Sequence, residues 1–232
     1  MSDDSSVAGN GSNETRDEPE VQLFAAERLA FFTDAVVAIA ITLLALDLEP
    51  PEGDSWSAVV SSISTQANGY IAFLISFFII ANAWVGHHAL FRYVTRSDAR
   101  LLWINLLWLL LVVVAPFFTR VIVDDKVYYQ VRFVGYAAVQ VLLGLVFIAM
   151  VSHATTAGLL VESTPIRFLR RLRIRSLVVV VPFALSIIAV FVPAIGEKAF
   201  VFWWLGPPVM GTILAVRRSR AERRAATSGS LA

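Results

Sequence analysis

The sequence contains no cysteine and only two lysines among its 232 residues. Without thiols the chain can form no disulfide framework, thiolate metal site or cysteine nucleophile. Both lysines, Lys126 and Lys198, fall in predicted loops, which leaves no buried amine for a retinal-type Schiff base. Charge is scarce as well: 16% of residues are charged and 57% are hydrophobic. A single soluble core is therefore not expected.

Long apolar runs take up more than half of the chain. About 20 consecutive apolar residues are needed to cross a hydrocarbon layer roughly 30 Å thick. We therefore predict an all-α, polytopic membrane protein with six transmembrane helices, at residues 28–48, 69–90, 101–122, 133–153, 176–195 and 199–216. An amphipathic stretch at 56–63 could lie on the membrane surface. Pro182 and Pro193 predict kinks in the fifth span.

Two polar segments flank the apolar region. Residues 1–22 are rich in Ser, Asp, Glu, Asn and Gly, a composition typical of disorder. They lack the features of a signal peptide, so we expect the first apolar run to be retained. The predicted organisation is a disordered cytoplasmic tail at 1–22, a six-span domain at 23–218 and a basic cytoplasmic tail at 219–232.

Basic residues are distributed very unequally between the two predicted sides. Fifteen of the nineteen lie in segments that share one side. Because Lys and Arg accumulate on the cytoplasmic side, we predict a plasma-membrane protein with both termini in the cytoplasm. Arginine runs at 167–175 and 217–224 are also typical of nucleic-acid binding, but membrane anchoring explains the same residues without a further assumption. Membrane lipids, and not nucleic acid, are the expected partners.

Several polar residues lie at membrane depth in the first three spans. Asp34 is about 9 Å along the helix from Arg28 and roughly 120° around it, so the two do not pair directly. Four further side chains share this depth on the next two spans: Trp84, His87, His88 and Asn105. Polar groups at this depth are costly unless they are paired. We expect a shared hydrogen-bonded cluster, either a structural clamp or a site of ion or proton handling.

The first span also carries an apolar stripe of Ile39, Leu43 and Leu46, with Thr42 about 60° from Ile39 around the helix. Such spacing ordinarily means packing. Four acidic residues follow the span: Asp47, Glu49, Glu52 and Asp54. A solvated loop is their ordinary interpretation.

Three motifs in order resemble the TMEM175-like family, in particular its prokaryotic six-span potassium channels. The family's Arg-x-x-x-Phe-Ser-Asp is similar to Arg28-x-x-x-Phe32-Thr33-Asp34, with Thr in place of Ser. The second and third motifs are Trp84-x-x-His87-His88 and Asn105-Leu-Leu, the latter continuing to Ala115-Pro116-Phe117-Phe118-Thr119. The resemblance covers about residues 25–120.

The resemblance implies a potassium-permeable cation channel, a homotetramer with the first helices around a central pore. The TVGYG filter of ordinary potassium channels is absent. By analogy, the pore is constricted by Ile39, Leu43 and Leu46, with Thr42 as a polar layer. The analogy also implies a network that holds the pore helix, made of Arg28, Phe32, Thr33, Asp34, Trp84, His87 and Asn105. Asp47, Glu49, Glu52 and Asp54 would then concentrate cations at the outer mouth.

A proton-coupled secondary cation transporter is the main alternative, because a buried carboxylate near histidines suits proton exchange. An enzyme is not expected, since neither Gly-x-Ser-x-Gly nor His-Glu-x-x-His occurs. His87 and His88 point about 100° apart on a helix and have no obvious third ligand, so neither a metal site nor a cofactor is predicted.

Overall fold

The computed structural model describes residues 11–194 and 196–203, and this part of the chain is helical apart from its connections. The elements are α1 (Gly11–Leu46), α2 (Trp56–Thr65), α3 (Ala67–Phe91), α4 (Ala99–Val123), α5 (Tyr129–Thr156), α6 (Ile166–Ala189) and a short 3₁₀ helix η1 (Gly196–Phe200).

Among the described residues, five helical segments are long and apolar enough to cross a membrane: Leu23–Leu46 of α1, and the whole of α3, α4, α5 and α6. They correspond to the first five predicted spans. The predicted sixth span, 199–216, lies almost wholly outside the described residues, as does the predicted C-terminal tail at 219–232. The amphipathic stretch before the second span forms α2, whose N-cap is the Ser55 side chain.

Two helices extend further than hydropathy predicts. α1 begins at Gly11, so residues 11–22 are helical where the sequence predicts disorder. A helix that is already nucleated gains one hydrogen bond for each residue added, without a second nucleation cost. α6 begins at Ile166, ten residues before the predicted start at 176, because arginine is a good helix former even where it is too polar for a span. It ends at Ala189, so Pro182 lies inside the helix but the kink predicted at Pro193 falls beyond it.

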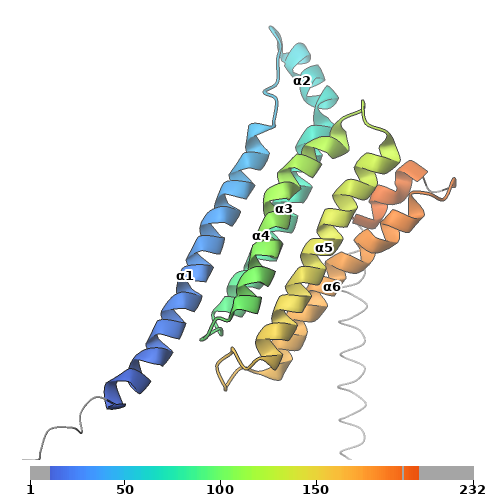
Figure 1. Ribbon diagram of the computed structural model, residues 1–232. Coiled ribbons are helices and arrows are strands. Elements are labelled where there is room, and N and C mark those ends of the chain that lie inside the picture. The colour runs from blue at the N-terminus through green and yellow to red at the C-terminus, as the bar shows by residue number, and fades with distance from the viewer. Residues whose placement is uncertain (1–10, 195, 204–232) are drawn as a thin grey trace, which may run out of the picture.

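The helices form a row with α1 at one edge (Figure 1). α1 packs against α3 and α4, α4 packs against α5, and α5 against α6. Successive spans run in opposite directions. One end of the bundle therefore collects Arg28, Arg92, Arg96, Arg100, Arg167, Arg170, Arg171, Arg173 and Arg175. The described basic residues of the other end are Arg120, Lys126, Arg132 and Lys198.

The two connections at the arginine-rich end are joined to each other. Val94, after α3, and Leu160, after α5, form an isolated antiparallel bridge. The backbone N–H of Thr95 donates to the carbonyl of Leu159 at 2.9 Å, and that of Val161 donates to Tyr93 at 2.9 Å. This joint links the hairpin of α3 and α4 to the hairpin of α5 and α6.

Near the opposite end, a buried polar contact joins the middle three helices. The hydroxyl of Thr119 on α4 donates to the hydroxyl of Ser76 on α3 at 2.8 Å. Ser76 also lies 2.9 Å from the hydroxyl of Tyr136 on α5. All three side chains are buried. In a membrane, where apolar contact between helices is matched by contact with lipid, such bonds help to specify which helices pair.

Candidate functional site

The first helix has one face packed against the subunit and one face open. Thr33, Val37, Ala40 and Leu44 are between 0% and 2% exposed and form the packed face. The predicted stripe lies on the open face: Ile39 is 60% exposed, Leu43 40% and Leu46 78%. Within one subunit the stripe therefore lies outside the core, although such spacing ordinarily indicates core packing.

Thr42 is also exposed, and its hydroxyl donates to the carbonyl of Ile39 at 2.8 Å. The hydroxyl hydrogen is thus used within the helix. The oxygen keeps its acceptor lone pairs on the open face. Thr42 therefore offers a polar oxygen among aliphatic side chains, a suitable partner for a cation.

Arg28 and Phe32 lie on the open face as well, apart from the predicted network. Phe32 is 52% exposed and sits two turns before Ile39. The guanidinium carbon of Arg28 lies 5.6 Å from the ring centroid of Phe24, one turn earlier on the same helix. The structure thus gives Arg28 a cation–π contact within α1.

Three residues of the predicted network are joined in a buried chain of hydrogen bonds. The amide nitrogen of Asn105 on α4 donates to the hydroxyl of Thr33 on α1 at 2.8 Å. The amide oxygen of Asn105 lies 2.7 Å from Nε2 of His87 on α3. All three side chains are 0% exposed. One amide therefore links three helices at the same depth.

The directions of these bonds fix the tautomer of His87. Thr33 donates its only hydroxyl hydrogen to the carbonyl of Leu29 at 2.9 Å, so it must accept from Asn105. The amide oxygen of Asn105 then faces His87, and because that oxygen only accepts, Nε2 of His87 carries the hydrogen. The ring stacks between Phe91 and Trp108, with centroids 4.2 and 4.8 Å away. His87 is therefore held as an oriented hydrogen-bond donor.

Asp34 belongs to a second, separate contact. The indole N–H of Trp84 on α3 donates to Oδ1 of Asp34 at 2.8 Å. The other carboxylate oxygen is 4.0 Å from Nδ1 of His88, whose side chain is 52% exposed. The motif residues thus form two contacts between α1 and its neighbours, one buried and one half-exposed.

The acidic segment after α1 is partly neutralised. Oδ1 of Asp47 lies 3.0 Å from the guanidinium of Arg120 at the end of α4. The segment is also tied to its surroundings through its backbone: the hydroxyl of Tyr70 donates to the carbonyl of Glu49 at 2.8 Å, and the N–H of Glu52 donates to the hydroxyl of Ser62 at 3.0 Å. Glu49, Glu52 and Asp54 are exposed and have no ion pair among the described residues.

Sequence reasoning missed the polar contact of Ser76, Thr119 and Tyr136, and the partnership of Asp47 with Arg120. It also missed Asn82 on α3, which accepts from Arg175 on α6 at 2.9 Å. Each of these residues is a polar group within or next to an apolar run, and that position is the signal that could have identified it. Which partners meet depends on helix rotation, which hydropathy does not report.

Known proteins resemble this chain in sequence. Residues 28–116 match the family model described as endosomal/lysosomal potassium channel TMEM175. A potassium channel from Streptomyces collinus is 36% identical over 135 residues, or 56% of this chain and 65% of that protein. A potassium channel from Chamaesiphon minutus is 35% identical over 173 residues, or 71% of this chain and 85% of that protein. The chain belongs to the TMEM175 family.

The fold agrees with this membership. The crystal structure of a lysosomal potassium-selective channel TMEM175 homologue from Chamaesiphon minutus aligns with a TM-score of 0.61 and 26% identity, over 84% of this chain and 97% of that one. The family-model match begins at Arg28 and ends at Pro116. It therefore spans the membrane part of α1, then α3 and most of α4, the helices that hold both motif contacts. The resemblance inferred from the three motifs is confirmed.

Proposed function

We propose that this protein is a potassium-permeable cation channel in which four copies of α1 surround a central pore. One observation carries the proposal: the Ile39, Leu43 and Leu46 stripe is exposed in the subunit and turned away from the face that packs on α3 and α4. The relatives described above are named potassium channels. A homotetramer gives the open face of α1 a partner in its own copies.

The chemistry of the stripe suits a gate. Four isoleucine or leucine side chains around an axis close a pore by excluding water, and a modest widening readmits water and ions. Thr42 lies between Ile39 and Leu43 along the chain and adds a ring of hydroxyl oxygens to which a cation can bind as its water is removed. Ile39, Leu43 and Leu46 are thus proposed as the constriction, and Thr42 as a layer contributing to selectivity.

A path through the interior of one subunit is disfavoured by charge. The cavity between α3, α4, α5 and α6 is lined by the guanidinium of Arg175. An uncompensated positive charge in a low-dielectric region repels potassium strongly. The same charge argues against the secondary transporter, which would bind its cation within the bundle. An axis between subunits avoids Arg175.

The acidic segment after α1 is proposed as the outer mouth. Arg120 balances Asp47, so the carboxylates of Glu49, Glu52 and Asp54 supply the remaining negative charge. Fourfold repetition of these groups would raise the local concentration of cations, and added salt would screen the effect.

The proposed topology has six spans within residues 23–218 and both termini in the cytoplasm, at the plasma membrane. The collection of arginines at one end of the bundle supports it, because positive residues and anionic lipids meet on the cytoplasmic side. Trp203, at the start of the predicted sixth span, stacks on Phe133 with centroids 4.6 Å apart and donates to the Ser186 hydroxyl at 2.9 Å. The chain is thus packed against α5 and α6 where that span begins.

Ion flux from proteoliposomes tests the function. Potassium should move down its own gradient, faster than sodium, with or without a proton gradient. Potassium movement that requires a proton gradient and saturates with potassium would instead establish the transporter.

A further inference from the structure

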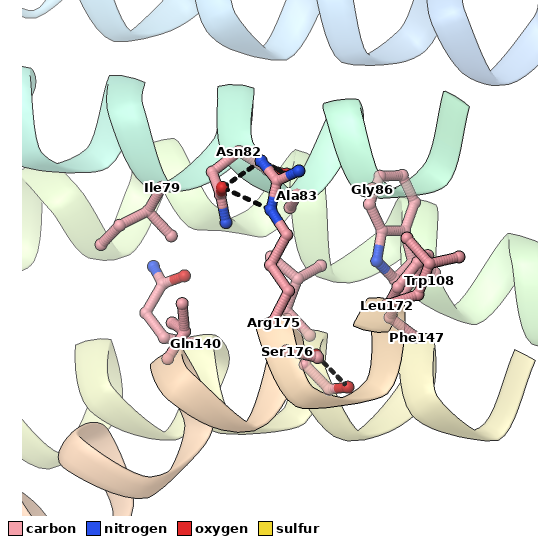
Figure 2. A pocket seen from close by; sticks show the side chains of 13 residues that line it. Ile79, Asn82, Ala83, Gly86, Trp108, Gln140, Phe147, Leu172, Arg175 and Ser176 are labelled. Carbon is pink, nitrogen blue, oxygen red and sulfur yellow. Dashed lines mark hydrogen bonds between the residues drawn. The ribbon is translucent and has the colours of Figure 1, made fainter. Parts of the chain in front are cut away.

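A cavity of about 40 Å³ lies inside the subunit between α3, α4, α5 and α6 (Figure 2). A water molecule needs about 10–15 Å³ of such space, so the cavity holds two or three guests of that size. Its rim, at Asn82 and Arg175, is half-buried, and its floor, at Gln140 and Trp108, is buried. No residue of α1 lines it. The cavity is therefore distinct from the proposed pore.

The floor of the cavity carries polar atoms without partners. Gln140 is 2% exposed, and neither its amide nitrogen nor its amide oxygen has a hydrogen-bond partner among the described residues. Trp108 is 0% exposed, and its indole nitrogen is likewise unpartnered there. Figure 2 shows the Gln140 amide pointing toward Asn82. Polar groups in a membrane interior are expensive to leave unsatisfied, so these atoms indicate a guest that binds them.

The rim adds a positive charge. Nε of Arg175 donates to the amide oxygen of Asn82 at 2.9 Å, and a terminal guanidinium nitrogen donates to the same oxygen. This bond to a neutral amide leaves the charge uncompensated, and among the described residues no carboxylate lies within 4 Å of Arg175. Arg175 is level with its partner Asn82, which lies eight residues, about 12 Å, inside the end of the predicted second span at residue 90. A charge at that depth ordinarily has a partner.

The chemistry of the lining selects the guest. Arg175, the amide nitrogens of Asn82 and Gln140, and the indole of Trp108 are donors, while the Gln140 oxygen is the one side-chain acceptor among these four residues that is not already bonded to Arg175. The hydroxyl hydrogen of Ser176 is already used, in a 3.0 Å bond to the carbonyl of Gly144. Donors around a guanidinium repel cations and attract anions. A volume of about 40 Å³ admits a monatomic anion with a water molecule.

We propose that this cavity is a binding site for a small monovalent anion of the halide class, chloride under ordinary conditions. The anion accepts from Arg175 and Gln140 and supplies the missing counter-charge, while bridging water donates to the Gln140 oxygen and accepts from Trp108. It ties α6 to α3, α4 and α5 and thereby stabilises the subunit. The site is independent of ion conduction, so a failure of the channel proposal would leave it standing.

Halide-dependent stability of the purified full-length chain in detergent tests the site. A ligand that binds the native state raises the unfolding midpoint in a saturable way. Titrating potassium chloride against potassium gluconate, at constant potassium concentration and ionic strength, should raise the midpoint with chloride. Bromide should substitute for chloride. Equal midpoints in both salts would show that the cavity holds water alone and would overturn the proposal.

Variants test whether the chloride dependence of the unfolding midpoint arises from this cavity. Gln140→Leu removes a donor to the anion and should lower the apparent chloride affinity about ten-fold, the loss of one hydrogen bond to an ion. Trp108→Phe removes a donor to the bridging water and should lower the affinity less. Gln130→Leu makes the same change on the same helix, away from the cavity, and should leave the chloride response intact. An undiminished response in Gln140→Leu or Trp108→Phe would place the anion elsewhere and refute the site. Should both variants fail to fold, anomalous scattering from bromide in wild-type crystals decides: a peak between Gln140 and Arg175 supports the site, and its absence overturns it.

Discussion

Asn105 on α4 donates a 2.8 Å hydrogen bond to Thr33 on α1, in a place from which solvent is fully excluded. Its amide oxygen meets His87 of α3 at 2.7 Å, so a single side chain holds the first three spans together. Lipid tails are as apolar as the helix surfaces, so such bonds, with close packing, decide how the helices associate. The position of α1, and hence of its open face, depends on this contact.

The first prediction concerns the hydroxyl of Thr33. Thr33→Val keeps the shape of the side chain but leaves the Asn105 amide with a buried, unsatisfied donor. We expect the free energy of unfolding to fall by about 1–3 kcal/mol. Thr33→Ser keeps the hydroxyl and should cost less. Denaturant unfolding in mild detergent measures both variants, and equal losses would show that the hydrogen bond is unimportant.

The second prediction concerns the apolar constriction. Ile39→Asn places an amide on the open face of α1, which should wet the proposed gate and increase potassium leak into proteoliposomes severalfold. Ile188→Asn is the matched control, since Ile188 is a similarly exposed isoleucine on α6, 69% against 60%. Its leak should equal that of the wild type. An unchanged flux in Ile39→Asn at equal reconstitution would remove Ile39 from the pore.

A third prediction concerns Asp98, the N-cap of α4. Its side chain accepts from the N–H of Leu101 at 2.7 Å and lies 2.8 Å from Nε2 of His153 on α5. Burial alone would raise the pKa of Asp98, but these two partners outweigh it and hold the pKa below its usual 3.8. Because the folded pKa is the lower one, the ionised carboxylate stabilises the fold above about pH 4 and this contribution disappears as the pH falls through the folded pKa.

Two variants separate the roles of Asp98. Asp98→Ala loses the cap and should destabilise the fold by about 1 kcal/mol at neutral pH. Asp98→Asn can keep the cap and should cost less, and its stability should not change as wild-type Asp98 titrates. Thermal unfolding from neutral pH to below pH 4 measures the difference between wild type and Asp98→Asn. A difference that grows as the pH falls would contradict the assigned direction.

The fourth prediction concerns the contact of α5 with α6 at Gly144. A Cβ at this position would overlap with Cγ2 of Val180, closer than two carbon atoms can approach. Gly144→Ala should therefore reduce the free energy of unfolding by about 1–3 kcal/mol, through overpacking. Val180→Ala in the same chain should recover part of the loss. Gly69→Ala, where a Cβ meets nothing within 4 Å, is the control and should not destabilise α3. Equal stability of Gly144→Ala and Gly69→Ala would show that the helices separate freely here.

Much of the fold could be predicted, because the length and apolarity of a span are local properties. The alternation of spans also predicts that Asp34, His87 and Asn105 lie at one depth. Helix ends were less predictable. Arginines lower the local hydropathy and so end a predicted span, yet α6 includes them and begins at Ile166. Residues 11–22 likewise join α1 despite a polar composition.

The rotation of each helix could not be read from the sequence. The spacing of Ile39, Leu43 and Leu46 is the same for a stripe facing the core and for one facing outward, and only the exposed fractions distinguish the two. The family resemblance implies one network for Arg28, Phe32 and Thr33, although Arg28 and Phe32 lie on the other side of α1 from Thr33. Asp47 and Arg120 are 73 positions apart in the chain, and no local sequence pattern predicts such a pair.

α1 is fastened to α4 at two points, Thr33 to Asn105 and Asp47 to Arg120. The points are 14 residues apart on α1, about 21 Å at 1.5 Å per residue. Because α1 is held at both places, it can neither slide nor tilt against α4 unless one of the two contacts breaks. If the pore widens while both remain, α4 must travel with α1. In the proposed channel the moving part would then be the pair α1 and α4, and the contact that breaks first would set the direction in which the pair rotates.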